Sequence, residues 1–182
     1  MGYCVVTDST HAEYAATPSC ASTSVCSESG LCGDGLTGCV ATEAGCANAQ
    51  TCPDDGTCGF DGTYCVGTAV GCQASASCRD RGYCGFSNQG CVPTAGGCKG
   101  SEDCKTNGSC AAPPESATES FDWYHPCKAS LEGCAASSMC ADMGLCGIQN
   151  GECTYTVDGC KNSRGCKENG TCTLRGGYCV KS

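Results

Sequence analysis

The sequence predicts a small disulfide-rich repeat array, an elongated rod of about six modules that each hold four cysteines in 26 residues. Three observations support this fold class: 25 of the 182 residues are cysteines, the cysteines recur at a fixed spacing, and large apolar side chains are scarce. Cysteine at such density is typical of disulfide scaffolds. We expect short hairpins and helical turns with little other regular structure. A disulfide-laddered β-solenoid is the alternative.

The cysteine spacing defines the repeat. Five residues separate the first cysteine from the second, five separate the second from the third, six separate the third from the fourth, and six lead to the next repeat. We call these positions a, b, c and d. Periods of this size indicate arrays in which each unit contacts mainly its neighbours. The predicted organisation is an N-terminal arm over 1–19, then repeats over 20–45, 46–71, 72–97, 98–133 (with an insert at 111–126), 134–159 and 160–182.

Cross-links replace a hydrophobic core in this prediction. The chain has five leucines, one isoleucine, three phenylalanines and one tryptophan, too few to fill an ordinary core. A disulfide typically contributes about 2–4 kcal/mol to stability. We therefore expect at least twenty-two of the 25 cysteines to be oxidised. We also predict that each repeat is closed locally, with a joined to c and b joined to d, because such short loops close easily.

The same cysteines predict location and partners. Disulfide scaffolds persist in oxidising places, so we expect the protein outside the cell or on its surface. No segment has the length of a membrane-spanning helix, so we expect no membrane insertion. The net charge of −9 argues against nucleic acid as a partner.

Glycine also recurs with the cysteines. It stands two residues before every c cysteine, and it directly precedes the a cysteine in five repeats. A position that is glycine in all six copies indicates positive φ or a close backbone approach. The six positions before c are Gly30, Gly56, Gly82, Gly108, Gly144 and Gly170.

The pattern C-x5-C-x3-G-x-C, followed by a further cysteine after a turn, resembles EGF-like and related cysteine-rich modules. It also resembles the cysteine-periodic surface antigens of protists. The resemblance covers Cys20 to Cys179 as cysteine and glycine spacing, and it implies an extracellular adhesive or surface-coat role. EGF modules have six unevenly spaced cysteines, whereas this repeat has four with nearly even gaps.

No pattern indicates catalysis or a cofactor. Zinc sites typically use closely spaced ligand pairs, but at least five residues separate any two cysteines here, and His11 and His125 are the two histidines. No nucleophile, zinc-protease or phosphate-binding motif is present. We therefore expect no enzymatic activity, no metal and no cofactor.

Charge is unevenly distributed along the chain. Residues 1–78 hold eight acidic and no basic residues, whereas residues 160–182 hold five basic residues and one acidic residue, a net charge of +4. Opposite charges at the two ends favour head-to-tail contact. We therefore predict a homopolymer that joins head to tail through the basic residues Lys161, Arg164 and Lys167. Its covalent link would involve Cys4, which lies outside the six sets, Cys179, or both.

Two further features predict sites. The insert holds Phe121, Trp123 and Tyr124, aromatic residues that either anchor an interface or fold back over their own repeat. Asn107-Gly108-Ser109 and Asn169-Gly170-Thr171 are N-glycosylation sequons, so we expect a glycoprotein.

The leading functional prediction is a structural subunit of an extracellular filament, surface coat or matrix. The alternative is a monomeric binding module, such as an adhesin, a toxin or a multi-headed protease inhibitor. An ice-binding solenoid is a third class, but it needs a periodic ladder of threonines, which we do not expect here.

Overall fold

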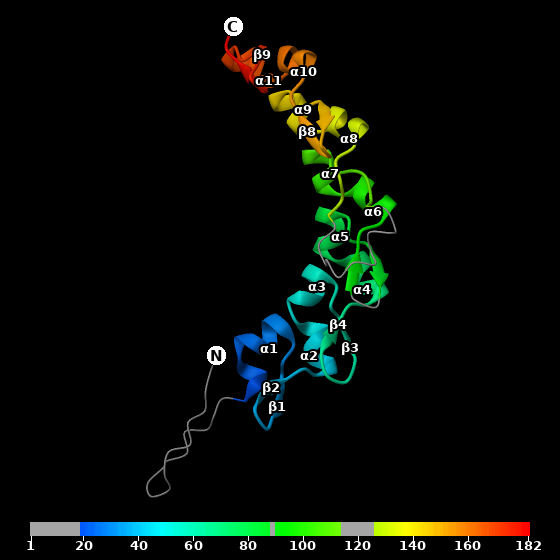
Figure 1. Cartoon of the computed structure of the whole chain (residues 1–182). Coiled ribbons are helices and arrows are strands. Elements are labelled where there is room, and N and C mark those ends of the chain that lie inside the picture. Colours follow the sequence, from blue (N-terminus) through cyan, green and yellow to red (C-terminus); the bar gives the residue numbers. More distant parts are fainter. Residues whose placement is uncertain (1–18, 88–89, 114–125) are drawn as a thin grey trace, which may run out of the picture.

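A computed structural model describes residues 19–87, 90–113 and 126–182. The repeats follow one another along a gently curved rod, with repeat one at one end and the C-terminus at the other (Figure 1). The predicted class, a disulfide-rich repeat array, is confirmed. The alternative β-solenoid is wrong, because the strands in the described ranges pair only as two-stranded hairpins.

Five of the six repeats have one order of elements: a first helix with the a cysteine, a second helix with the b cysteine, and a hairpin whose second strand holds the d cysteine. The first helices are η1 (Cys20–Ser22), α2 (Glu43–Asn48), α4 (Ala69–Ala74), α6 (Ala95–Gly100), α8 (Leu131–Ala136) and α10 (Val157–Asn162). The second helices are α1 (Ser24–Ser29), α3 (Thr51–Asp55), α5 (Ala76–Arg81), α7 (Glu102–Asn107), α9 (Ser138–Met143) and α11 (Arg164–Asn169).

The hairpins pair β1 (Gly33–Gly35) with β2 (Gly38–Val40), β3 (Gly59–Phe60) with β4 (Cys65–Val66), β5 (Gly85–Ser87) with β6 (Gly90–Val92), β7 (Gly147–Gln149) with β8 (Glu152–Thr154), and β9 (Thr173–Arg175) with β10 (Tyr178–Val180). In repeat four, a single antiparallel bridge between Ala111 and Lys128 takes the place of the hairpin. The bridge brings the two ends of the insert together, so Cys127 still occupies the d position of its repeat.

A periodic hydroxyl begins each first helix from repeat two onward. The side chain four residues before the a cysteine accepts a hydrogen bond from the glycine N–H three residues later, at 2.9–3.0 Å. Such a side chain satisfies a helix N–H group that has no partner within the helix. Our expectation of no periodic threonines is therefore wrong, although these hydroxyls are used inside the protein. The five residues are Thr42, Thr68, Thr94, Ser130 and Thr156.

A second periodic hydroxyl begins the second helix. In repeats three to six a serine accepts from the b-cysteine N–H at 3.1 Å and donates to the a-cysteine carbonyl at 2.8–3.0 Å. These serines are buried, and Ser101 is completely so. A buried hydroxyl is tolerated here because both of its hydrogen-bonding roles are used. The serines are Ser75, Ser101, Ser137 and Ser163.

Each second helix ends at the glycine that stands two residues before the c cysteine. The six glycines have φ between 74° and 92°, the left-handed conformation that favours glycine at helix ends. The prediction of positive φ from their recurrence is confirmed.

All 24 cysteines from Cys20 to Cys179 are paired, in twelve disulfides. Every disulfide lies within one repeat, as predicted, but the predicted a–c and b–d pairing is wrong. The pairs are a–d and b–c. The hairpin returns d to a, and the left-handed glycine turns the chain so that b and c have Cα atoms 4.5–4.6 Å apart.

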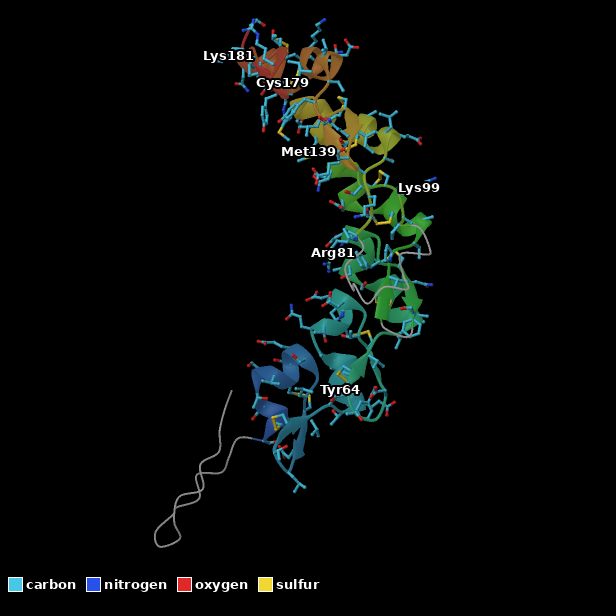
Figure 2. The ribbon with its side chains drawn as sticks, in the orientation of Figure 1. Tyr64, Arg81, Lys99, Met139, Cys179 and Lys181 are labelled. Atoms are coloured by element: carbon cyan, nitrogen blue, oxygen red, sulfur yellow. A yellow bond between two sulfur atoms is a disulfide. The ribbon has the colours of Figure 1, made fainter. Side chains whose placement is uncertain are left out.

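Sulfur forms the core of the rod. The a cysteines of repeats two to six are completely buried, and the other buried apolar residues of the described ranges are Cys20, Ala41, Ala49 and Cys127. The disulfides recur along the whole length of the rod, with charged side chains such as Arg81 and Lys99 on opposite sides (Figure 2). Cross-links thus replace large apolar side chains, as the composition predicted.

Candidate functional site

The most regular feature of the rod is the contact between one repeat and the next, which we call the joint. At each of the five joints the carbonyl of the left-handed glycine accepts a hydrogen bond from the N–H of the capping threonine or serine, at 3.2–3.3 Å. Each such bond contributes about 0.5–1.5 kcal/mol net. The capping residue therefore both starts a helix and ties it to the repeat before it.

Glycine is required on both sides of the joint. A Cβ on Gly30 would lie 2.8 Å from the backbone nitrogen of Cys46, and a Cβ on Gly45 would lie 2.3 Å from the Gly30 carbonyl oxygen. At the four later joints, a Cβ on the glycine before a would lie 2.3–2.5 Å from the carbonyl oxygen of the left-handed glycine. The glycine before a therefore serves close backbone approach, a role not predicted from its recurrence.

The a–d disulfide completes the joint. Its d sulfur lies 3.0–3.3 Å from the carbonyl oxygen of the residue before the left-handed glycine of the preceding repeat. The sulfur carries no proton, because it is bonded to the a sulfur, so this is a close sulfur–oxygen contact and not a hydrogen bond. Each repeat thus places its own disulfide against the end of its neighbour's second helix.

In the described structure, the corresponding surface of repeat six is uncovered. The five earlier glycines are buried, whereas Gly170 is exposed. A Cβ on Gly170 would meet no atom within 4 Å. We call this surface, formed by Asn169, Gly170 and the end of α11, the end face.

Repeat one is built differently at the opposite end. Its a cysteine follows Ser19 instead of glycine, and η1 is a short 3-10 helix instead of an α-helix. The backbone N–H of Cys20 donates to the Asp34 carboxylate at 2.9 Å. In repeat two the equivalent N–H, that of Cys46, donates to the Thr42 carbonyl. In repeat one, the N–H of the a cysteine is therefore satisfied by Asp34, a side chain of the hairpin of the same repeat.

A groove of about 350 Å³ lies between repeats five and six. Asp142, Tyr155, Arg164 and Glu168 contribute to its lining. Arg164 bridges the two repeats through an ion pair of 3.1 Å with Asp142. The groove is polar and open to solvent, so it could accommodate a charged or hydrogen-bonding group.

The predicted basic residues lie on two helices. Lys161 is on α10, and Arg164 and Lys167 are on α11; all three residues are exposed. Arg164 already has a partner in Asp142. Lys161 and Lys167 are therefore the better probes of a basic interface.

Asn107 and Asn169 end equivalent second helices, α7 and α11, and both are exposed. The Asn107 side chain donates to the Asp103 carboxylate. Asn169 also contributes to the groove beside Arg164.

Of the other residues predicted to form sites, one is in a disulfide and the rest lie outside the described residues. Cys179 is bonded to Cys160, so it is not free for an intermolecular disulfide. Cys4 and the aromatic residues Phe121, Trp123 and Tyr124 lie outside the described residues. If Cys4 alone forms a bond between chains, the covalent product is a dimer, because a disulfide polymer needs two such cysteines per chain.

The two hydroxyl positions that begin the helices were not predicted from the sequence. Their signal was present, because threonine or serine recurs four residues before a, and serine three residues after a, in most repeats. Both positions stand directly before short segments of small residues, which is typical of helix N-caps.

No protein-family model, curated protein or solved structure matches the chain. Twelve disulfides indicate an oxidising, extracellular or secreted environment. Within the ranges that the structure describes, no helix combines the length and the apolar character needed to cross a membrane.

Proposed function

We propose that the protein is a structural subunit of an extracellular filament, surface coat or matrix. The observation that carries this proposal is the uniform joint, which repeats the same glycine–cap hydrogen bond five times along one rod. Contacts that recur at every step suit a protein whose length and stiffness are its function.

The disulfide pattern supports the same role. Each repeat is closed by its own two disulfides, so no repeat depends on a distant part of the chain to stay folded. A rod of this kind tolerates local damage, because loss of one repeat's disulfides leaves the others cross-linked. That property suits material exposed to an oxidising environment and to mechanical load.

The charge difference between the ends supports assembly with a direction. Repeats one and two expose acidic residues, and the last repeat exposes Lys161 and Lys167. Complementary charges on two partners raise the rate of association more than they raise the affinity. Head-to-tail joining of copies is therefore part of the proposal.

The sequons support a glycosylated surface. Both asparagines are exposed at the ends of second helices, where an attached glycan points away from the rod. Treatment of native material with a peptide N-glycosidase should lower its mass by one or two glycans.

The groove favours a second candidate, a monomeric binding module. Its mixed acidic and basic lining, with Asp142, Arg164 and Glu168, suits recognition of a polar ligand. Adhesins, toxins and protease inhibitors are the classes that this candidate covers.

Negative-stain microscopy of native material separates the two candidates. The structural proposal expects filaments or lattices whose axial repeat equals the length of one rod. Labelled antibodies should place them outside the cell. Isolated short rods at all concentrations would contradict the structural proposal and support the binding module.

A pair of charge variants tests the basic end. Lys161→Glu with Lys167→Glu should shorten the assemblies, because it removes the positive charge that attracts the acidic repeats. The matched control is Lys99→Glu with Lys128→Glu, which changes net charge equally in the middle of the rod, where both lysines are exposed. Equal shortening by both pairs would show a general effect of net charge.

A further inference from the structure

We propose that the groove between repeats five and six binds the first sugar of an N-linked glycan on Asn169. The sequon and the groove coincide, because Asn169 and Thr171, the two residues that define the sequon, both line the groove. The inference rests on the proposed glycosylation of this asparagine, and it adds where the first sugar lies and what holds it. The outer sugars point away from the rod.

The two sequon asparagines differ in their surroundings. The Asn107 side chain donates to the Asp103 carboxylate, one helical turn before it. Repeat six has Gly165 at the position of Asp103, so the Asn169 amide lacks this partner. The exposure of Asn169 does not depend on the end face being uncovered, because Asn107 is also exposed although repeat five covers Gly108. Asn169 is therefore the asparagine whose attached sugar is free to turn into a groove.

An aromatic wall distinguishes this groove from the other joints. Tyr155 stands two residues after the d cysteine of repeat five and is half-buried. Its ring lies against that of Tyr178, with the centroids 5.6 Å apart and the planes inclined by 55°. The second ring thus holds the first in place. The residues that correspond to Tyr155 at the other four joints are small or lack an aromatic ring: Ala41, Gly67, Pro93 and Ala129.

Gly165 provides the space beside the sequon. A Cβ at this position would lie 3.0 Å from the Thr171 hydroxyl and 3.3 Å from the Asp142 carbonyl oxygen, so a side chain would crowd the groove. The groove has a volume of about 350 Å³. Sites for small molecules usually measure about 300–1,000 Å³, so this volume suits one sugar residue and not an extended oligosaccharide.

The lining suits N-acetylglucosamine, the first sugar of an N-linked glycan. The sugar has a face of C–H groups that can pack on the Tyr155 ring, and its hydroxyl and amide groups both donate and accept hydrogen bonds. The Asp142 and Glu168 carboxylates accept, and the Arg164 guanidinium donates. Two carboxylates and one guanidinium leave a net charge of −1, which favours a neutral ligand over an anion.

The bound sugar would connect two repeats. Asp142 and Tyr155 belong to repeat five, whereas Arg164 and Asn169 belong to repeat six, and the ion pair between Arg164 and Asp142 already spans this joint. A sugar attached to Asn169 and packed on Tyr155 adds a second link across the same joint. It also fills the groove, so a bound sugar counts against the binding-module candidate.

The first test compares how fast a peptide N-glycosidase releases the two glycans from the full chain, secreted by a glycosylating cell line. In native protein the Asn169 glycan should be released at least about fivefold more slowly than the Asn107 glycan, because its first sugar must leave the groove before cleavage. After reduction and denaturation the two rates should be equal. Glycopeptide mass spectrometry measures both.

Two variants locate the cause of the slow release. Tyr155→Ala should raise the release rate at Asn169 to that at Asn107 and leave Asn107 unchanged. Tyr64→Ala is the matched control, because Tyr64 is an exposed tyrosine of repeat two, and it should change neither rate. Slow release at Asn169 that persists in Tyr155→Ala would overturn the proposal.

The second test needs no variant. Wild-type protein whose glycans have been trimmed to one N-acetylglucosamine should show a nuclear Overhauser effect between the sugar on Asn169 and the Tyr155 ring, and none from the sugar on Asn107. An unglycosylated Asn169, equal native release of the two glycans, or absence of the contact with Tyr155 each overturns the proposal.

These outcomes are distinguishable from those of the structural role. Filaments of native material in which Asn169 carries no glycan would support the structural role and overturn this inference. Isolated short rods with a sugar bound against Tyr155 would do the reverse.

Discussion

At the residue scale, one atom decides whether repeats can stack. Two neighbouring glycines of α6 illustrate this, because they share a helix and differ only in surroundings. A Cβ on Gly97 would lie 2.4 Å from the Gly82 carbonyl oxygen, whereas a Cβ on Gly96 would meet nothing within 4 Å. Composition alone does not distinguish the two residues, but their register against the a cysteine does.

We expect Gly97→Ala to lower the free energy of unfolding by about 1–3 kcal/mol, because the added methyl group forces the joint apart. Gly96→Ala should raise it by about 0.5–1 kcal/mol, because alanine is the better helix former at an open position. Guanidinium unfolding with the disulfides intact measures both. Equal effects of the two substitutions would mean that the joint tolerates the methyl group.

At the element scale, repeat two shows what a missing cap does. Ala49 stands where repeats three to six have a buried serine, and it is itself buried. The second helix of this repeat, α3, has Gln50 as its N-cap residue, and the Gln50 side chain makes no capping hydrogen bond. The helix has five residues, whereas its counterparts have six.

Ala49→Ser should therefore stabilise the protein by about 0.5–2 kcal/mol, the usual contribution of a helix N-cap. The new hydroxyl would accept from the Cys52 N–H and donate to the Cys46 carbonyl, as Ser101 does with Cys104 and Cys98. Thermal unfolding measures the gain. Ala47→Ser, on the exposed side of α2, is the control and should give none; a loss of stability at position 49 would contradict the assignment.

The disulfide pattern also belongs to the element scale. The b–c disulfide spans the end of the second helix, and the a–d disulfide ties the first helix to the hairpin. Neither spacing nor loop length distinguishes this pattern from a–c with b–d, because all of these loops are short. The hairpin and the left-handed glycine decide it.

Non-reducing peptide mapping should recover Cys134 with Cys153 and Cys140 with Cys146 from repeat five, and the equivalent pairs elsewhere. Intact mass should show twelve disulfides. Recovery of a–c and b–d pairs would mean that the hairpin does not return d to a.

At the scale of the whole molecule, the rod depends on its cross-links. The first and second helices of the described repeats have three to six residues, far below the length at which an isolated helix is stable in water. Their buried partners are mainly cysteines. Little apolar area remains to hold the helices once the disulfides are opened.

Complete reduction and alkylation should therefore remove the helical circular dichroism signal of the whole chain. The untreated chain under the same buffer conditions is the control. Helical signal that persists after alkylation would show that packing between repeats suffices without disulfides.

The sequence by itself determined the repeat, its number and its dependence on disulfides, because cysteine and glycine positions are visible as spacing. It also indicated positive φ at the glycine before c, since a residue without a Cβ recurs where a helix must end. The capping hydroxyls were equally periodic, and they were missed because no cysteine marks them.

Only the tertiary structure decided which cysteines pair and which glycines a neighbouring repeat covers. Pairing depends on where the hairpin places d, which is a three-dimensional property of the glycine turn and the strand register. Gly144 is buried and Gly170 is exposed, although both have the same local sequence pattern and a left-handed backbone conformation. Local sequence sets the shape of each repeat, and contact with a neighbour decides whether that shape is a joint or a free surface.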